Sequence, residues 1–248
     1  MNKNFIIFVA CDTSNLNQVK KIISQTKTNK FKIIPKFGLQ FFYSKNGRRF
    51  IEKFKKDFWL DLKINDIPQT ATSAINSLKD LKYCRYLTVH VNGGLKMLKA
   101  VNKKAKQINK NLKILGVTLL TSLNNKSLKE IGHTKSVKKL ILKQANLIKK
   151  AGLNGIVCSG GIEAKIIKKK YKNMFIVTPW IRLPGDRSND QSRVTTPRDA
   201  LIKNKASAIV MGRSLVQGNI KKNIKKLIDH LNKWSKIVRF AASQITKY

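Results

Sequence analysis

Two acids and a lysine stand close together in the stretch FWLDLKINDIPQT, residues 58–70. Asp61, Lys63 and Asp66 directly follow an apolar run, in a chain that has only 12 acidic residues. The run is typical of a short buried strand, and Asp66 with the Ile-Pro pair after it is typical of the start of a helix. Asp61 and Lys63 have the same parity, so on a strand they point to the same side. Opposite charges gathered at the end of a buried strand indicate a built site rather than a solvated surface.

Each of these residues also has a structural explanation. Asp66 is well placed to be the N-cap of a helix, where a carboxylate accepts backbone N–H bonds and complements the helix dipole. Asp61 and Lys63 could form an ion pair with no role in catalysis. Lys36, in IIPKFG, could extend its ammonium to solvent, but Gly38 after it suggests that something approaches the backbone closely.

The stretch MGRSL, near the end of the chain, indicates a second kind of chemistry. Gly212 exposes backbone N–H groups where a helix begins, and Arg213 adds a bidentate donor, so together they could bind an anion. The segment at 178–197 is polar, punctuated by Pro and Gly, and long for a connector. We expect it to be a mobile lid over that anion pocket.

Short apolar runs alternate with longer amphipathic stretches along the whole chain. The predicted strands are Ile6–Cys11, Lys32–Lys36, Phe58–Lys63, Tyr86–Val91, Lys113–Leu119, Gly155–Cys158, Phe175–Val177 and Ala208–Met211. The predicted helices are Leu16–Ser24, Gln40–Phe54, Pro68–Leu81, Leu95–Ile108, Ser136–Ala151, Ile162–Lys169, Pro197–Asn204 and Ile220–Trp234. This rhythm predicts an α/β fold, a single (β/α)8 TIM barrel, with a doubly wound open sheet as the alternative.

A barrel would place its functional residues just after its strands, because such sites use the C-terminal face. Polar residues do end or follow the predicted strands: Asp12, Lys36, Asp61, Lys63, His90, Thr121, Arg182 and Arg213, the last preceded by Gly212. His90 and Cys158 are expected to be interior residues. The chain has only three histidines and no ligand-like spacing, so we expect no metal site.

Composition limits the class of protein. No composition break divides the 248 residues, so we expect one catalytic domain at residues 1–234 and a C-terminal extension at 235–248, expected to be helical. No apolar run is long enough to span a membrane and no secretory signal is recognisable at the start. Three scattered cysteines in apolar runs indicate free thiols in a reducing compartment, so a cytoplasmic location is expected.

The formal net charge of +40 could indicate a nucleic-acid partner. Its lysines, however, are spread over nearly every predicted helix instead of forming one face. We therefore expect a basic, solvated surface without a specific nucleic-acid partner.

These motifs resemble one known family. DLKINDIPQT is similar to the Asp-x-Lys-x-x-Asp-Ile-Pro motif of the orotidine 5'-phosphate decarboxylase family. The resemblance continues through CD at Asp12, KFG at Lys36, VHVNGG, GVTLLTS, GIVCS, TPWIR, DQSRVTTP and VMGRS. The resemblance implies a homodimeric (β/α)8 enzyme of pyrimidine biosynthesis without cofactor or metal. Such an enzyme converts orotidine 5'-monophosphate to uridine 5'-monophosphate and carbon dioxide.

The resemblance also implies roles by position. Lys63 would protonate the C6 carbanion and Asp61 would crowd the departing carboxylate. Lys36 would hold the charge network and the ribose, and Asp66 would come from the neighbouring subunit. The implied substrate-binding residues are Asp12 and Lys36 at the ribose, Thr70, Thr121 at the pyrimidine with Ser122 as its close rival, and Arg182, Gln191, Gly212 and Arg213 at the phosphate.

The chain departs from the family pattern in two places. Trp180 stands where TPGIR normally has glycine, and CSGG replaces a continuation of small residues. Two other functions remain open from the sequence: a magnesium-dependent keto-sugar phosphate decarboxylase or hexulose-phosphate synthase of the same superfamily, and a basic nucleic-acid-binding protein that has lost catalysis.

Overall fold

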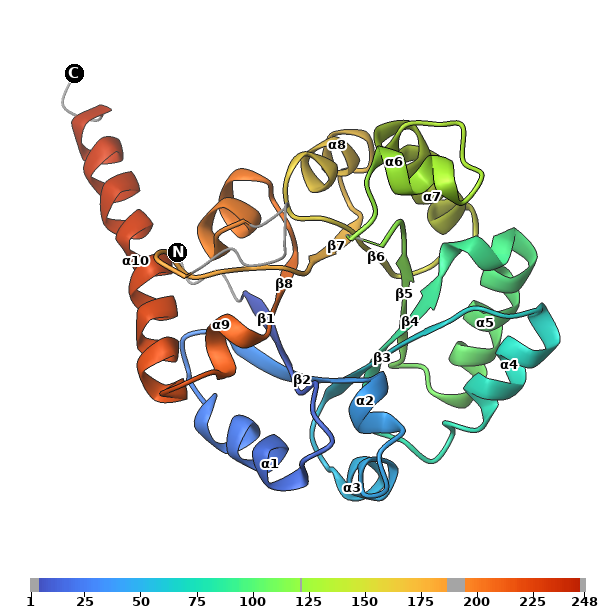
Figure 1. The fold of residues 1–248 in the computed structure, drawn as a ribbon. Coiled ribbons are helices and arrows are strands. Elements are labelled where there is room, and N and C mark those ends of the chain that lie inside the picture. The colour runs from blue at the N-terminus through green and yellow to red at the C-terminus, as the bar shows by residue number, and fades with distance from the viewer. Residues whose placement is uncertain (1–4, 121, 187–194, 246–248) are drawn as a thin grey trace.

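Eight parallel strands close a barrel in the order β1 to β8, with the helices outside it (Figure 1). The computed structural model describes residues 5–120, 122–186 and 195–245, with the backbone alone at Ile162 and at 233–245. The strands are β1 (Ile6–Ala10), β2 (Lys32–Gly38), β3 (Phe58–Ile64), β4 (Cys84–His90), β5 (Lys113–Val117), β6 (Gly155–Val157), β7 (Phe175–Thr178) and β8 (Ala208–Met211). The pairing of β1 with β8, from Ile6↔Ala208 to Val9↔Met211, closes the barrel. The (β/α)8 prediction is therefore confirmed, and the open-sheet alternative is wrong.

The helices largely follow the predicted order, with differences in their bounds. They are α1 (Leu16–Gln25), α2 (Leu39–Phe42), α3 (Gly47–Lys53), α4 (Pro68–Asn76), α5 (Gly94–Ile108), α6 (Asn125–Glu130), α7 (Val137–Lys150), α8 (Ile162–Lys170), α9 (Arg213–Val216) and α10 (Ile220–Ile245). A 3-10 turn, η1 (Val91–Gly93), and a π-helix, η2 (Asp199–Lys203), complete the described elements. α6 was not predicted, and the helix expected to end at Leu81 ends at Asn76.

The predicted helix Gln40–Phe54 is two short helices, α2 and α3, separated by a tight turn. The hydroxyl of Ser44 donates to the Phe41 carbonyl at 2.7 Å, which ends α2. A Cβ on Gly47 would lie 1.6 Å from that same carbonyl oxygen, so only glycine fits the approach. The turn directs α3 back onto the barrel, where Phe50 and Phe54 pack against Phe37.

The C-terminal helix α10 runs without a break from Ile220 to Ile245, past the expected helix end at Trp234. Its first turns bury Ile220, Ile224 and Leu227, while its far end extends away from the barrel (Figure 1). Residues 235–245 thus continue α10. Within the described residues, no helix is both long and apolar enough to cross a membrane.

The alternation of side chains along each strand separates two packed layers. Outward residues such as Ile7 and Val9 pack under the helices, in the larger cluster of buried side chains. Inward residues fill the barrel with a second cluster: Phe8, Ala10, Ile34, Trp59, Tyr86, Leu115, Val117, Val157, Val177, Ala208 and Val210. The inward row of each strand ends at the C-terminal mouth of the barrel, where the next residue of the same parity must meet solvent or a ligand.

Candidate active site

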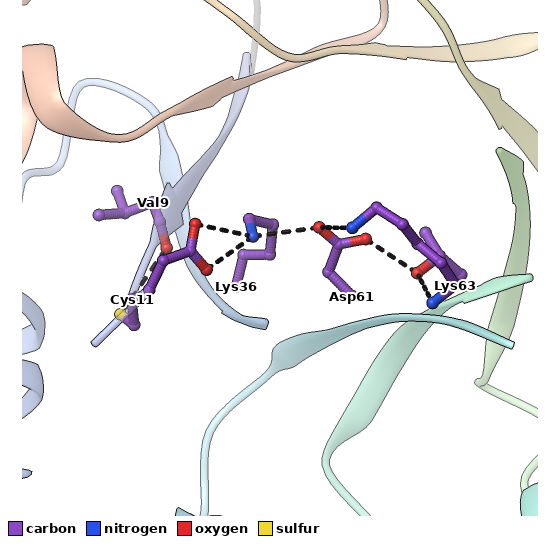
Figure 2. Close-up of polar contacts among 7 residues, drawn as sticks. Val9, Cys11, Lys36, Asp61 and Lys63 are labelled. Atoms are coloured by element: carbon purple, nitrogen blue, oxygen red, sulfur yellow. Dashed lines mark hydrogen bonds and ion pairs between the residues drawn. The ribbon is translucent and has the colours of Figure 1, made fainter. Parts of the chain in front are cut away.

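Four charged side chains form an alternating row across the mouth of the barrel (Figure 2). Lys36 Nζ lies 3.1 Å from Asp12 Oδ1 and 3.1 Å from Asp61 Oδ2. Lys63 Nζ lies 3.0 Å from that same Asp61 oxygen. Each ammonium therefore has a carboxylate beside it, and Asp61 stands between two ammonium groups. Asp12, Lys36, Asp61 and Lys63 are called the charge row below.

Strand parity places three of the four residues. Asp12 continues the inward row of Phe8 and Ala10 on β1, Lys36 follows Ile34 on β2, and Asp61 follows Trp59 on β3. Because β1, β2 and β3 are neighbours in the barrel, their last inward side chains meet. The floor beneath them is apolar, and Lys36 Nζ lies 6.0 Å from the centre of the Trp59 ring.

Lys63 reaches the row by another route. The pairing of β3 with β4 jumps from Leu60↔Leu87 to Ile64↔Val89, so β3 bulges at this point. Within the bulge Lys63 has φ of 49°, in the left-handed region. Equal parity with Asp61 gave the correct expectation that the two side chains meet, but a bulge and not a regular strand brings them together.

Thr88, on the inward face of β4, holds the bulge and was not singled out from the sequence. Its hydroxyl donates to Asp61 Oδ1 at 2.9 Å and accepts from the Lys63 backbone N–H at 3.0 Å. Thr88 is fully buried. It therefore fixes both the carboxylate and the backbone that carries the second ammonium. Its shared parity with Tyr86 was the signal that could have identified it.

Burial and charge oppose one another in the row. Burial alone would lower the pKa of Lys36, but the carboxylates of Asp61 and Asp12 outweigh it and raise that pKa. Burial alone would raise the pKa of Asp61, but the ammonium groups of Lys36 and Lys63 outweigh it and lower that pKa. Both groups are thus held in their charged forms, a fixed electrostatic field that needs no rearrangement when a substrate binds.

A cavity of about 540 Å³ opens above the charge row. This volume suits a small-molecule ligand. Its polar and charged lining consists of Asp12, Thr13, Gln18, Lys36, Asp61, Lys63, Ser122, Arg182 and Arg213, and its apolar lining includes Trp59, Leu120, Pro179 and Trp180. The cavity therefore brings together the charge row and two arginines.

Arg182 follows β7 and Arg213 begins α9, and the two segments are tied together. The Leu183 N–H, just after Arg182, donates to Ser214 Oγ at 2.9 Å, just after Arg213. Ser214 Oγ in turn donates to Asp186. Gly212 is the N-cap of α9 and also lines the cavity. The residues predicted to bind an anion thus line the cavity, with two cationic side chains among them.

Some predicted site residues are not part of this cavity. Asp66 is exposed, and its carboxylate accepts the Ile67 N–H at 2.7 Å. Because the N-cap of α4 is Ile67, the explanation of Asp66 as that cap is wrong. Thr70 is exposed on the first turn of α4. Thr121 and Gln191 lie outside the described residues, whereas Ser122, the rival of Thr121, lines the cavity.

His90 and the cysteines differ in their surroundings. His90 is half-buried at the end of β4 and accepts the Asn92 N–H through Nδ1, so it is not a fully buried core residue. Burial and the nearby Lys63 lower its pKa. Cys158 is buried as predicted. Burial raises the pKa of Cys11 to about 12, although Lys36 acts in the opposite direction.

No group of three or more potential metal-ligating side chains gathers within the described part of the chain.

Comparison with known proteins relates this geometry to one family. The family model described as "Orotidine 5'-phosphate decarboxylase / HUMPS family" matches residues 6–226. An orotidine 5'-phosphate decarboxylase of Wolbachia sp. subsp. Brugia malayi is 37% identical over 225 residues, covering 90% of this chain and 96% of the relative. One from Staphylococcus epidermidis is 38% identical over 216 residues, covering 84% and 90%. The crystal structure of the Lactobacillus acidophilus orotidine 5'-phosphate decarboxylase has a TM-score of 0.78 at 28% identity, covering 92% of this chain and 99% of the other.

Proposed function

The chain belongs to the orotidine 5'-phosphate decarboxylase / HUMPS family, and on that basis we propose that it removes the carboxylate of orotidine 5'-monophosphate. The products are uridine 5'-monophosphate and carbon dioxide, and the reaction consumes one proton. It is a carboxy-lyase of pyrimidine biosynthesis.

The observation that carries this proposal is the charge row at the base of the cavity. Loss of carbon dioxide leaves an electron pair in the plane of the pyrimidine ring at C6, where the ring cannot delocalise it. A fixed ammonium beside C6 stabilises that pair and then transfers a proton to it. Lys63 is the member of the row that fits this role, because it stands at the end of the row and is about one-third exposed to the cavity.

Asp61 has a different task. Its carboxylate is nearly buried, with both oxygens engaged by Lys36, Lys63 and Thr88. A substrate carboxylate placed against it meets a like charge that cannot move away, so the ground state is destabilised until carbon dioxide leaves. Lys36 keeps this acid ionised.

The other parts of the substrate are assigned to residues around the cavity. Asp12 and Lys36 are proposed to bind the ribose hydroxyls. The phosphate is assigned to Arg182, Gln191, Gly212 and Arg213, and the pyrimidine edge to Thr121 or Ser122. Phosphate binding far from C6 supplies energy for positioning the reacting end. Thr70 is assigned to the substrate with Asp66, from the neighbouring subunit.

The enzyme is proposed to be a homodimer with shared active sites. Asp66 and Thr70 are both exposed on one chain, which suits residues that act in a neighbour's cavity. Tyr43, just after α2, and Ile67, just before α4, are 75% and 65% exposed, and both lie in segments that follow strand ends. A partner subunit placed over these segments would cover them and bring in Asp66.

We further propose a cytoplasmic enzyme that needs no cofactor and has no specific nucleic-acid partner. We propose that residues 1–234 form the catalytic barrel and that 235–248 are a C-terminal extension, whose described part continues α10. The same basic surface would bind DNA weakly, and 0.5 M salt should abolish that binding while the enzyme keeps working.

The direct test is loss of orotidine monophosphate absorbance in the presence of the purified protein. The family also contains the magnesium-dependent alternative, so the assay is repeated in excess chelator with hexulose phosphate as the competing substrate. Full activity on orotidine monophosphate in chelator supports the proposal. Activity only on the sugar phosphate, lost in chelator, would assign the alternative. Asp61 Oδ2 already faces two ammonium groups and Oδ1 accepts from Thr88, an environment that suits a divalent cation poorly.

A further inference from the structure

Trp180 has φ of 66°, in the left-handed region that favours glycine. It lies two residues after the end of β7, in the segment TPWIR, where the resembling motif has glycine. A bulky aromatic residue in this conformation is rare, because its Cβ crowds the backbone. The left-handed backbone conformation therefore does not by itself explain why a tryptophan stands here.

The surroundings hold the strained residue in place. Ile181 is fully buried and forms an isolated β-bridge with Thr195. The Arg182 N–H donates to the Thr195 carbonyl at 3.1 Å. With Leu183 bonded to Ser214 as well, the chain just after Trp180 is fixed on two sides. Strained residues persist where the structure determines them in this way, and they cluster where ligands bind.

The side chain of Trp180 lies on the wall of the cavity. It is half-buried and lines the cavity beside Pro179 and Arg182. The other aromatic side chain in the described lining is Trp59, which is 1% exposed and lies under Lys36. Trp180 is therefore the aromatic surface that remains available to a ligand in the described cavity.

We propose that Trp180 packs its indole against the pyrimidine–ribose part of the bound nucleotide and so contributes to recognition of the base. The inference rests on the proposed function. The arginines, the charge row and Trp180 all line this one cavity. The arginines suit the phosphate and the charge row suits the reacting end, so the aromatic side chain suits the planar, partly apolar ring. Trp180 is a specificity-determining residue here, and no proton transfer is assigned to it.

Three variants separate the ring from the backbone. Trp180→Gly and Trp180→Asn both fit the left-handed conformation and remove the ring, while Trp180→Phe keeps an aromatic ring and the strain. Isothermal titration gives the dissociation constant for uridine 5'-monophosphate, and competition gives that for ribose 5-phosphate, which lacks the base. Circular dichroism and the thermal midpoint check that each variant is folded.

The glycine and asparagine variants should bind uridine 5'-monophosphate about 5- to 100-fold more weakly, the range expected for stacking on one base. Their affinity for ribose 5-phosphate should change less than about twofold, and the phenylalanine variant should stay close to the wild type. The loss should appear in KM more than in kcat.

Two results would overturn the role of Trp180 while leaving the proposed function intact, provided that the wild type turns over its substrate. The first is an equal loss of affinity for uridine 5'-monophosphate and for ribose 5-phosphate. The second is an unchanged affinity for the nucleotide in folded glycine and asparagine variants. A wild type that neither binds uridine 5'-monophosphate nor consumes orotidine monophosphate would instead overturn the proposed function, and with it this contact.

Discussion

Asp61 and Lys36 form a buried ion pair, so the stability of the fold is expected to depend on both side chains. It is 8% exposed, its partner Lys36 is 5% exposed, and both are charged. Removing one member of such a pair is costly, because the other is left in a poor solvent for its charge.

Asp61→Asn should lower the free energy of unfolding by about 3 kcal/mol, the cost of leaving a buried ammonium short of one partner. Asp80→Asn is the matched control, because Asp80 makes an ion pair of 2.7 Å with Arg48 while its side chain is 46% exposed. The control should change stability by about 1 kcal/mol or less. Urea unfolding measures both. Equal losses of unfolding free energy in Asp61→Asn and Asp80→Asn would mean that the cost of removing the carboxylate does not depend on its burial.

The same comparison has an expected pH dependence. The pKa of Asp61 is lowered in the folded protein, so its contribution is fully present above the ordinary carboxyl pKa, about 3.9, and is lost as the pH falls through the folded value. The stability difference between wild type and Asp61→Asn should therefore be constant from about pH 5 to 8 and narrow below about pH 4. A difference that widened in acid would contradict the assigned ionisation state.

Lys63→Ala should reduce kcat at least about 10³-fold, because the ammonium both stabilises the carbanion and donates the proton. Stability should change little, since Lys63 is about one-third exposed. Lys99→Ala, on the exposed side of α5, is the control and should keep full activity. Turnover and uridine 5'-monophosphate binding are measured together, and near-normal turnover in a folded Lys63→Ala protein would remove the proton-donor role.

At the residue scale, the sequence singled out all four members of the charge row, because polar residues at strand ends stood out, but it expected Asp66 in the array and Asp12 only at the ribose. It did not single out Thr88, because parity alone shows that this residue points inward and its importance comes from two partners 25 and 27 residues away. Asp66 shows the reverse case, since the local pattern of an acid before Ile-Pro suggested a cap that the helix does not use.

At the scale of elements, the link between β2 and α2 passes very close to the charge row. A Cβ on Gly38 would lie 2.5 Å from Asp12 Oδ1 and 3.5 Å from Lys36 Nζ. The sequence predicted that something approaches this glycine closely, and in the structure it is the carboxylate of Asp12, just after β1. An added methyl group would have to displace the end of that side chain.

Gly38→Ala should therefore weaken substrate binding by about tenfold, the effect of losing one good polar contact, with less than about 1 kcal/mol change in stability, since the clash is with a flexible side chain. Gly161→Ala is the control, because a Cβ there meets no atom within 4 Å. KM and the thermal midpoint are the measurements. A Gly38→Ala enzyme with wild-type KM would show that Asp12 can move without consequence.

The strands were easier to predict than the segments between them. Apolar runs and alternation fix a strand within one or two residues, whereas a bulge such as that at Lys63 depends on the register with β4. The break between α2 and α3 was marked by Ser44 and Gly47, but amphipathic periodicity across it favoured one helix. Such turns are decided by backbone contacts that periodicity does not report.

At the scale of the whole molecule, the shared site makes a sharp prediction. Asp66→Asn and Lys63→Ala homodimers should each be nearly inactive. After dissociation and reassociation together, the heterodimer should regain one good site, because one cavity receives both intact residues and the other receives neither. Recovered activity measured against the fraction of heterodimer tests this. Heterodimers without recovery would place Asp66 in its own subunit's site.

The three cysteines, all buried in the folded chain, give that experiment a practical route. Burial raises the pKa of Cys84, as it does that of Cys11, to about 12, so thiolate is scarce at neutral pH and alkylating reagents find little to attack. A single cysteine introduced on an exposed helix, for example Lys99→Cys on α5, would be the reactive thiol of the native protein. Two populations carrying different fluorophores at that position would then report subunit exchange in real time, without first removing any natural cysteine.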